Sequence, residues 1–360
     1  MKKEKNNHLK TITKRTPHVL FDLCHPAHVH LFRNFINFVK SENYDVTVVS
    51  RDKDVTNQLL DEYGIEYNSI SRASAGFFGK LVEFISRTRK ILKLNREKQF
   101  DYAFGTSVSI GFLSLFSGVE SYVFNEDDDA TVPFFCILAY PFAEHICNPE
   151  GLEYRKWRGK RYFFNSYHEL AYLHPANFAP DKKVLEKYNV EIGKYAVIRL
   201  SALNAHHDSR AAGISDNLQG KIIERLKGLH IIVLKEGEEQ VQYDVEGRAS
   251  CFKLQVSDSH HLLAFTKILI SDSQTMSIEA AVLGVPSVRI STFADKSSVL
   301  HELEDKYQLT RAFQPENGDE ILDVITQIIE KPESKKIYSE RKEKMLEEKT
   351  DLNKWMKELL

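Results

Sequence analysis

Residues 271–289 read SDSQTMSIEAAVLGVPSVR and join the end of a strand, a polar turn and a helix in one short unit. The preceding run KILI (267–270) is apolar and β-branched, which is typical of an interior strand. The turn at 271–275 consists mostly of small polar side chains. Residues 276–283 then have helical apolar spacing, which Gly284 and Pro286 end. Strands and helices alternate in this way along most of the chain, which predicts an α/β fold of doubly wound type.

A helix that begins where a strand ends predicts an anion site in the turn. The first N–H groups of the helix have no partner inside it, and this end of its dipole is positive. Ser273 and Thr275 supply hydroxyls that can cap the helix or hold a phosphate. Glu279 stands one turn further in, where a carboxylate can reach ribose hydroxyls. An ordinary capped helix with a solvated Glu279 is the alternative.

The same stretch resembles the nucleotide-sugar site in the C-terminal domain of GT-B-fold proteins. The match is to the segment Asp-Ser-Gly-Gly-Ile-Gln-Glu-Glu-Ala of the non-hydrolysing UDP-N-acetylglucosamine 2-epimerases. On this resemblance Asp272 and Ser273 correspond to the family's Asp-Ser, Glu279 to its ribose-binding Glu, and residues 284–286 to its Gly-x-Pro.

One pair of residues departs from that pattern. Gln274 and Thr275 replace two glycines, so side chains stand where the relatives bring bare backbone close to the phosphates. The resemblance implies a nucleotide-binding set made of Asp272, Ser273, Gln274, Thr275 and Glu279.

Nearly the whole chain is similar to a prokaryotic family catalogued as a domain of unknown function, number 354. That family is grouped with GT-B glycosyltransferases and is found among polysaccharide-assembly proteins. The resemblance implies two Rossmann-like, doubly wound domains facing across a cleft. The segments that carry it are VLFDLCHPAHVHLFRNF, VVSRDKDVTNQLLDEYGIEY, FNEDDDATVPFF, SYHELAYLHPANFAPD and RLSALNAHHD.

Length and composition agree with this organisation. A chain of 360 residues with 42% hydrophobic residues can bury two cores of about 150 residues each. Lys and Arg number 49 against 51 Asp and Glu, so no overall basic excess favours nucleic acid. The four cysteines have no metal-binding or disulfide-framework spacing, which is typical of reduced thiols in a cytoplasmic protein.

The pattern predicts five consecutive segments. No secretory signal follows the basic tail, and no run approaches the roughly 18 apolar residues of a spanning helix. We therefore expect a cytoplasmic protein, with attachment to the inner membrane face as an alternative. The segments are a disordered tail (1–16), an N-terminal Rossmann-like domain on the acceptor side (17–166), an interdomain segment (167–181), a C-terminal nucleotide-sugar domain (182–334) and a terminal helix (335–360) that in GT-B proteins commonly crosses back to the first domain.

Three histidines, His25, His28 and His30, directly follow the first strand. In open α/β sheets ligands bind beyond the carboxyl ends of strands, so this loop is a candidate site. On the epimerase resemblance His25 and Pro26 stand where those enzymes have Arg-Pro, so His25 would face the phosphates or the sugar. A metal site and simple packing or capping are the alternatives; GT-B enzymes generally need no metal, and we predict none.

An acidic run, NEDDD at 125–129, follows another predicted strand. Adjacent carboxylates raise one another's pKa when they are not solvated or paired. Glu126 resembles the catalytic-site Glu that follows the equivalent strand in the epimerases. The alternative is a solvated acidic turn that caps the next helix through Asp129.

A third candidate loop follows the first strand of the second domain. It carries His206, His207, Asp208 and Arg210, and the epimerases have a His-Arg-Arg-Glu segment in this place. An imidazole beside Asp208 has a carboxylate partner, and the guanidinium of Arg210 can donate two hydrogen bonds to a phosphate. A plain surface loop is the alternative.

The predicted helix 80–98 carries apolar residues on one side and basic residues elsewhere, and it follows Phe77 and Phe78. Such a helix either packs on its sheet with a solvated basic face or lies against a membrane that holds a lipid-linked acceptor.

These patterns favour glycosyl transfer from a nucleotide sugar, UDP-linked on the resemblance, to a glycan or lipid-linked acceptor. The nucleotide sugar is the substrate, and no cofactor is expected. His25, His28 or Glu126 would take the acceptor proton, while residues 272–279 and Arg210 would hold the nucleotide. One alternative is a UDP-amino-sugar 2-epimerase that uses Glu126 with His206 or His207. Another is a nucleotide-sugar-binding protein without turnover.

Overall fold

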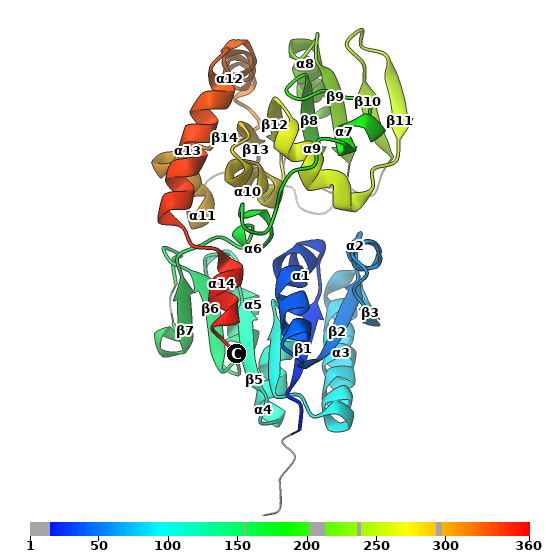
Figure 1. Cartoon of the computed structure of the whole chain (residues 1–360), viewed down its shortest axis with the longest axis vertical. Helices are drawn as coiled ribbons and strands as arrows, with labels where there is room; N and C mark the ends of the chain where they lie inside the picture. The colour runs from blue at the N-terminus through cyan, green and yellow to red at the C-terminus, as the bar shows by residue number, and fades with distance from the viewer. Residues whose placement is uncertain (1–14, 155, 202–212, 236–238, 293–296) are drawn as a thin grey trace, which may run out of the picture.

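The protein has two α/β domains stacked along its long axis (Figure 1). The structure is a computed structural model. It describes residues 15–154, 156–201, 213–235, 239–292 and 297–360. Most of the predicted tail, residues 1–14, therefore lies outside the described residues. Arg15 is not part of a free tail, because its guanidinium lies 2.7 Å from the Asp101 carboxylate of the first domain.

The first domain is built on a seven-stranded sheet in which all strands are parallel. The strand order is β3-β2-β1-β4-β5-β6-β7, so the direction of winding reverses between β1 and β4. In a doubly wound sheet this switch point is where the loops part and leave a ligand crevice. The strands are β1 (His18–Leu23), β2 (Asp45–Asp52), β3 (Asn68–Arg72), β4 (Tyr102–Gly105), β5 (Glu120–Phe124), β6 (His145–Pro149) and β7 (Arg161–Phe164).

Helices cover both faces of this sheet, and the alternation of side chains along β1 divides the core between them. Phe21 packs with α1 (Pro26–Ser41) and α2 (Thr56–Glu62), whereas its neighbour Leu20 packs on the opposite face. Burial on both faces explains the continuous apolar run HVLFDL. The helices of the opposite face are α3 (Gly76–Lys98), α4 (Val108–Phe116) and α5 (Pro133–Ala139).

The second domain has a seven-stranded mixed sheet of order β11-β10-β9-β8-β12-β13-β14. Five strands are parallel, and β10 and β11 add an antiparallel hairpin at one edge. Asp244, which accepts from the Glu246 and Arg248 amides, and Gly247 at φ 83° form the turn of this hairpin. The strands are β8 (Tyr195–Leu200), β9 (His230–Lys235), β10 (Gln240–Tyr243), β11 (Ala249–Phe252), β12 (Ile268–Ser271), β13 (Ser287–Ile290) and β14 (Thr310–Phe313).

The helices of the second domain follow the strands in the usual alternation. They are α7 (Val184–Lys187), α8 (Asp216–Arg225), α9 (Ser259–Phe265), α10 (Gln274–Leu283), α11 (Ser298–His301), α12 (Gly318–Glu330) and α13 (Ser334–Glu348). Single turns of 3₁₀ or π type lie at Arg158–Lys160, Val256–Asp258 and Glu302–Lys306. No helix in the described part of the chain is long and apolar enough to cross a membrane.

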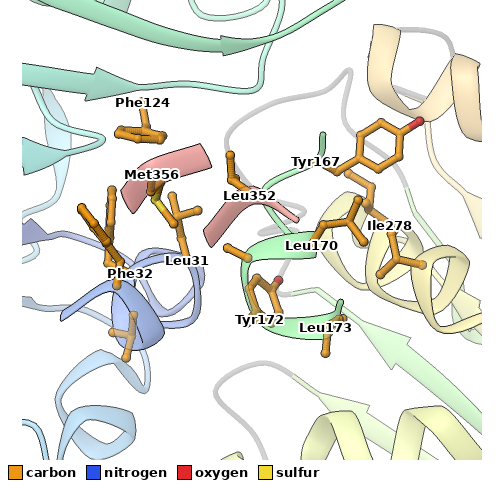
Figure 2. Close-up of a cluster of buried hydrophobic side chains, with 14 of the residues drawn as sticks. Leu31, Phe32, Phe124, Tyr167, Leu170, Tyr172, Leu173, Ile278, Leu352 and Met356 are labelled. Atoms are coloured by element: carbon orange, nitrogen blue, oxygen red, sulfur yellow. The ribbon is translucent and has the colours of Figure 1, made fainter. Parts of the chain in front are cut away.

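A short helix, α6 (Leu170–Leu173), joins the two domains and is fully buried. Figure 2 shows it between α1 with α14 (Leu352–Lys357) on one side and Ile278 of α10 on the other. These side chains belong to one hydrophobic core that continues from the first domain into the second. Burial of this shared core holds the two domains together.

The prediction of one terminal helix over 335–360 is wrong, because α13 and α14 are separate helices. At the break, the Thr350 amide donates to the Asn165 carbonyl at 2.9 Å. Asp351 then caps α14 by accepting from the Asn353 amide. The chain turns there, and the Asn353 side chain donates to the Ala171 carbonyl at 2.7 Å, so α14 lies against α6 and α1.

Candidate active site

The first side of the candidate site is the turn between β1 and α1. His25 is the N-cap of α1: its backbone is extended, and its Nδ1 accepts from the Ala27 amide at 3.3 Å. His28 Nδ1 accepts from the Cys24 amide at 3.2 Å and lies 2.7 Å from the hydroxyl of Thr106, which follows β4. Burial, followed by the nearby His25, lowers the pKa of His28 well below its ordinary value. His28 is therefore a neutral ring whose Nδ1 lone pair is occupied.

His30 is not part of this site. It is buried between the domains, where its ring stacks on Tyr172 at 5.1 Å and meets His260 at 4.5 Å. Helical spacing turns it away from His25 and His28. Within the described residues, no group of three or more His, Cys, Asp or Glu side chains is arranged to hold a metal ion.

The four acidic residues after β5 have different partners. Both carboxylate oxygens of Asp129 accept from Nη2 of buried Arg161, at 2.9 and 2.7 Å. The interpretation of Asp129 as the cap of the next helix is therefore wrong, since α5 begins only after Val132. Asp128 instead caps α11 of the second domain by accepting from the Ser298 amide and hydroxyl at 2.9 and 2.7 Å. The other two acids, Glu126 and Asp127, line the pocket described below.

Two ionisable residues that the sequence analysis missed come from the interdomain segment. His168 Nδ1 lies 3.3 Å from Glu126 Oε2, within ion-pair range but without hydrogen-bond geometry. Glu169 is buried beside them. Among the described residues, Glu126 Oε2, His168 Nε2 and Glu169 Oε2 have no hydrogen-bond partner. Buried polar atoms without partners are uncommon and mark places where a ligand can supply the missing bond.

Crowding of carboxylates shifts their protonation. Burial, and then the neighbouring Glu126 carboxylate, raise the pKa of Asp127 to about 6. The same two causes raise the pKa of Glu169 well above its usual range. Both shifts favour the protonated form, and Glu169 lines the same pocket as Glu126.

These groups surround one pocket of about 180 Å³ between the domains. It lies at the carboxyl ends of β1, β4 and β5, at the switch point of the first sheet. The second domain contributes Thr275 from the first turn of α10. The lining residues are His25, Ala27, His28, Leu31, Thr106, Asn125, Glu126, Asp127, His168, Glu169, Tyr172 and Thr275.

The turn before α10 is well ordered by its own side chains. Ser273 is the N-cap, and its hydroxyl accepts from the Met276 amide at 3.4 Å. Asp272 Oδ1 accepts from the Ser201 amide at 2.7 Å, and burial raises the pKa of this carboxyl. Gln274 begins the helix. Of this turn, Thr275 alone lines the pocket.

Glu279 does not stand free to meet a ribose, as the resemblance implied. It is 5% exposed, and its Oε1 accepts from the Tyr172 hydroxyl at 2.9 Å and lies 2.9 Å from His260 Nε2. Both partners come from other segments of the chain, so the spacing of residues in α10 could not predict these contacts. In this structure Glu279 belongs to the junction between the domains. The candidates His206, His207 and Arg210 lie outside the described residues.

Residues 18–356 match the family described as protein of unknown function, DUF354. The chain belongs to this family. No curated protein matches the sequence. Membership confirms the family resemblance seen in the sequence.

Solved structures with the same fold are distant in sequence. The UDP complex of S. aureus MnaA has a TM-score of 0.63 at 10% identity, with 93% of this chain and 92% of that chain covered. The Neisseria meningitidis UDP-GlcNAc 2-epimerase bound to UDP-GlcNAc has a TM-score of 0.58 at 13% identity, covering 89% and 94%. The forosaminyltransferase SpnP of spinosyn has a TM-score of 0.59 at 12% identity, covering 96% and 99%. These matches confirm the GT-B fold with two Rossmann-like domains.

Proposed function

We propose that this DUF354 protein is a glycosyltransferase that moves a sugar from a nucleotide sugar, UDP-linked, to a glycan or lipid-linked acceptor. The main support is the pocket, which combines a carboxylate oxygen that accepts no hydrogen bond from the described residues, Glu126 Oε2, with the first turn of α10 at Thr275. The first can take a proton, and the second can hold a leaving diphosphate. In this proposal the nucleotide sugar is the substrate, and neither a cofactor nor a metal ion takes part.

Glu126 is the better candidate for the base than either histidine. His28 has its Nδ1 lone pair occupied by the Cys24 amide, so the neutral ring carries its proton on Nε2. His25 uses its Nδ1 to cap α1. Glu126 Oε2 is buried and accepts no hydrogen bond from the described residues, and His168 Nδ1 lies 3.3 Å from it. A buried lone pair of this kind is available to an acceptor hydroxyl.

The acceptor oxygen attacks the anomeric carbon of the sugar while Glu126 takes the hydroxyl proton. The bond between the anomeric carbon and the diphosphate oxygen breaks, and its electron pair leaves with the nucleoside diphosphate. Thr275 and the first free N–H groups of α10 would stabilise the negative charge on that diphosphate.

A second candidate function is a 2-epimerase acting on a UDP-amino sugar by elimination and re-addition. One observation favours it: Glu126 and Glu169 line the same pocket, and the pKa of Glu169 is raised by burial. Two carboxyl groups in one pocket can supply the acid/base pair that such a reaction needs. A nucleotide-sugar-binding protein without turnover is the third candidate.

Product analysis separates these functions. The purified chain is incubated with a panel of UDP-sugars, with and without glycan and lipid-linked acceptors, and UDP and sugar products are resolved by chromatography. Release of UDP that depends on acceptor supports transfer. An epimerised sugar without UDP release supports the epimerase, and binding without either product supports the third candidate.

A pair of matched variants tests the role of the base. Glu126→Gln is expected to lower kcat by about 10²- to 10⁴-fold, the usual contribution of a general base. Glu153→Gln is the control, because Glu153 is a nearby but exposed acid outside the pocket. Full activity in folded Glu126→Gln would contradict the assignment of the base.

A further inference from the structure

The first domain exposes an unusual concentration of apolar side chains on one face. Ten of the thirteen large hydrophobic side chains that are exposed in the described residues lie on α3, α4 and α5. Phe78 is 80% exposed and Phe134 81% exposed. The ten are Phe77, Phe78, Leu81, Val82, Ile85, Leu115, Phe116, Phe134, Ile137 and Leu138. Apolar patches of this extent mark binding surfaces rather than ordinary exposure.

These helices are neighbours, so their exposed residues form one surface. α4 packs against α3 on one side and α5 on the other. Phe112 of α4 touches Phe84 of α3, with ring centroids 5.4 Å apart, and Phe142 beyond α5 at 4.7 Å. All three helices cover the same face of the sheet, opposite α1 and α14. We call the ten exposed residues the apolar face.

The long helix α3 is anchored by part of its length only. Buried Arg87 pairs with Asp22 of β1, and Glu83 pairs with Arg51 at 2.6 Å. Ile91 enters the core, but the first two turns place Phe77, Phe78 and most other apolar residues in solvent. The C-terminal half of the helix therefore packs on the sheet, as one interpretation of its sequence held, whereas its N-terminal half leaves most of its apolar residues exposed.

The charge around the apolar face is positive. Along α3 the exposed stripe Phe78, Val82 and Ile85 continues at helical spacing into Arg89, Lys93 and Arg96, all exposed. The sequences of α4 and α5 contain no charged residue. Beyond α5, Lys156 and Arg158 are exposed as well. Apolar side chains flanked by cations suit an anionic bilayer, because the apolar groups can enter the boundary of the acyl chains while the cations contact the lipid phosphates.

We propose that the apolar face docks on a membrane of anionic phospholipid. A symmetric pair of chains joined through this face would bring two basic stripes into one interface, whereas lipid phosphates neutralise them. Phe77 and Phe134 lie in the first turns of α3 and α5. Each of these helices follows the carboxyl end of a strand, so it begins at the carboxyl edge of the sheet. The pocket lies at the same edge. Docking therefore brings the pocket near the headgroups, where a lipid-linked acceptor would stand.

Vesicle binding tests this surface without any sugar substrate, so its result is independent of the proposed function. The full chain is mixed with sedimenting vesicles of phosphatidylcholine alone or with 30% phosphatidylglycerol (about one lipid in three, for a strongly anionic surface). We expect the chain to pellet with the anionic vesicles and to be released by high salt. No binding to anionic vesicles would overturn the proposal.

Two variants locate the binding surface. Phe78→Ser/Val82→Ser/Phe134→Ser is expected to lower the partition coefficient at least about tenfold, because the apolar part of the binding is lost. The matched control Ile192→Ser/Val245→Ser changes exposed apolar residues of the second domain and should bind like the unchanged chain. Equal binding by both variants would overturn the proposal. So would a dimer in sedimentation velocity that the triple variant dissolves, because the face would then bind a second copy.

Discussion

Tyr172 donates a hydrogen bond to Glu279 across the junction of the two domains, with 2.9 Å between the two oxygens. Tyr172 also lines the candidate pocket, and Glu279 lies in the helix whose first turn completes it. His260 reaches the same carboxylate oxygen at 2.9 Å. The relative position of the two halves of the pocket therefore depends on this buried carboxylate.

Removing the carboxylate should destabilise the protein. Glu279→Ala leaves the Tyr172 hydroxyl and His260 Nε2 without an acceptor, which costs about 1 to 3 kcal/mol of unfolding free energy. Tyr172→Phe should cost less, about 1 kcal/mol. The two changes share one hydrogen bond, so urea unfolding of the double variant should show less than the sum. Strict additivity would mean that the two side chains do not interact.

The buried histidine His30 should lower stability as the solution becomes acidic. Burial, and then nearby His260, lower the pKa of His30 well below that of a histidine in the unfolded chain. Below about pH 6.5 the unfolded chain binds a proton that the folded chain excludes, which costs up to about 1.4 kcal/mol per pH unit and per histidine. The pKa of His28 is lowered in the same way, so His28 also makes stability fall as the pH falls. Urea unfolding of the unchanged chain and of His30→Phe at pH 7, 6 and 5 isolates this contribution, because the slopes of stability against pH should differ by about one proton. An unchanged slope of stability against pH would show that His30 does not contribute to the pH dependence.

Asp127 should affect stability with the opposite sign. Its pKa is raised to about 6, so the ionised form at pH 7 is unfavourable in the folded protein. Asp127→Asn should raise the unfolding free energy at pH 7 by about 1 to 3 kcal/mol, and the gain should shrink between pH 6 and 4. Turnover should fall if the pocket uses this carboxyl. A variant that is less stable than the unchanged chain at pH 7 would show that Asp127 is well accommodated when ionised.

Most of the strands, the GT-B fold and four of the pocket residues, Thr275 among them, could be predicted from the sequence. His25, His28 and Glu126 follow apolar strands directly, and parallel strands bring such loops to one edge. The pairing of Asp129 with Arg161 could not be predicted, because 32 residues separate the two and strand register alone brings them together.

His168 and Glu169 were missed for a related reason. They stand in a segment without helical or strand periodicity, whose prolines and aromatic residues suggested only a connection. The signal available was two adjacent ionisable residues followed directly by the apolar run LAYL, which is buried in full. Charged residues beside a wholly buried helix need partners or a function. The break before α14 had a similar local signal, the capping residue Asp351.

A structure of the chain with a bound UDP-sugar would show whether the candidate pocket is the active site. We expect the diphosphate at the first turn of α10, with an oxygen within hydrogen-bond distance of Thr275, and the sugar beside Glu126. A nucleotide bound elsewhere, for example in the pocket of about 460 Å³ beside Ser298 and Lys306, would contradict it.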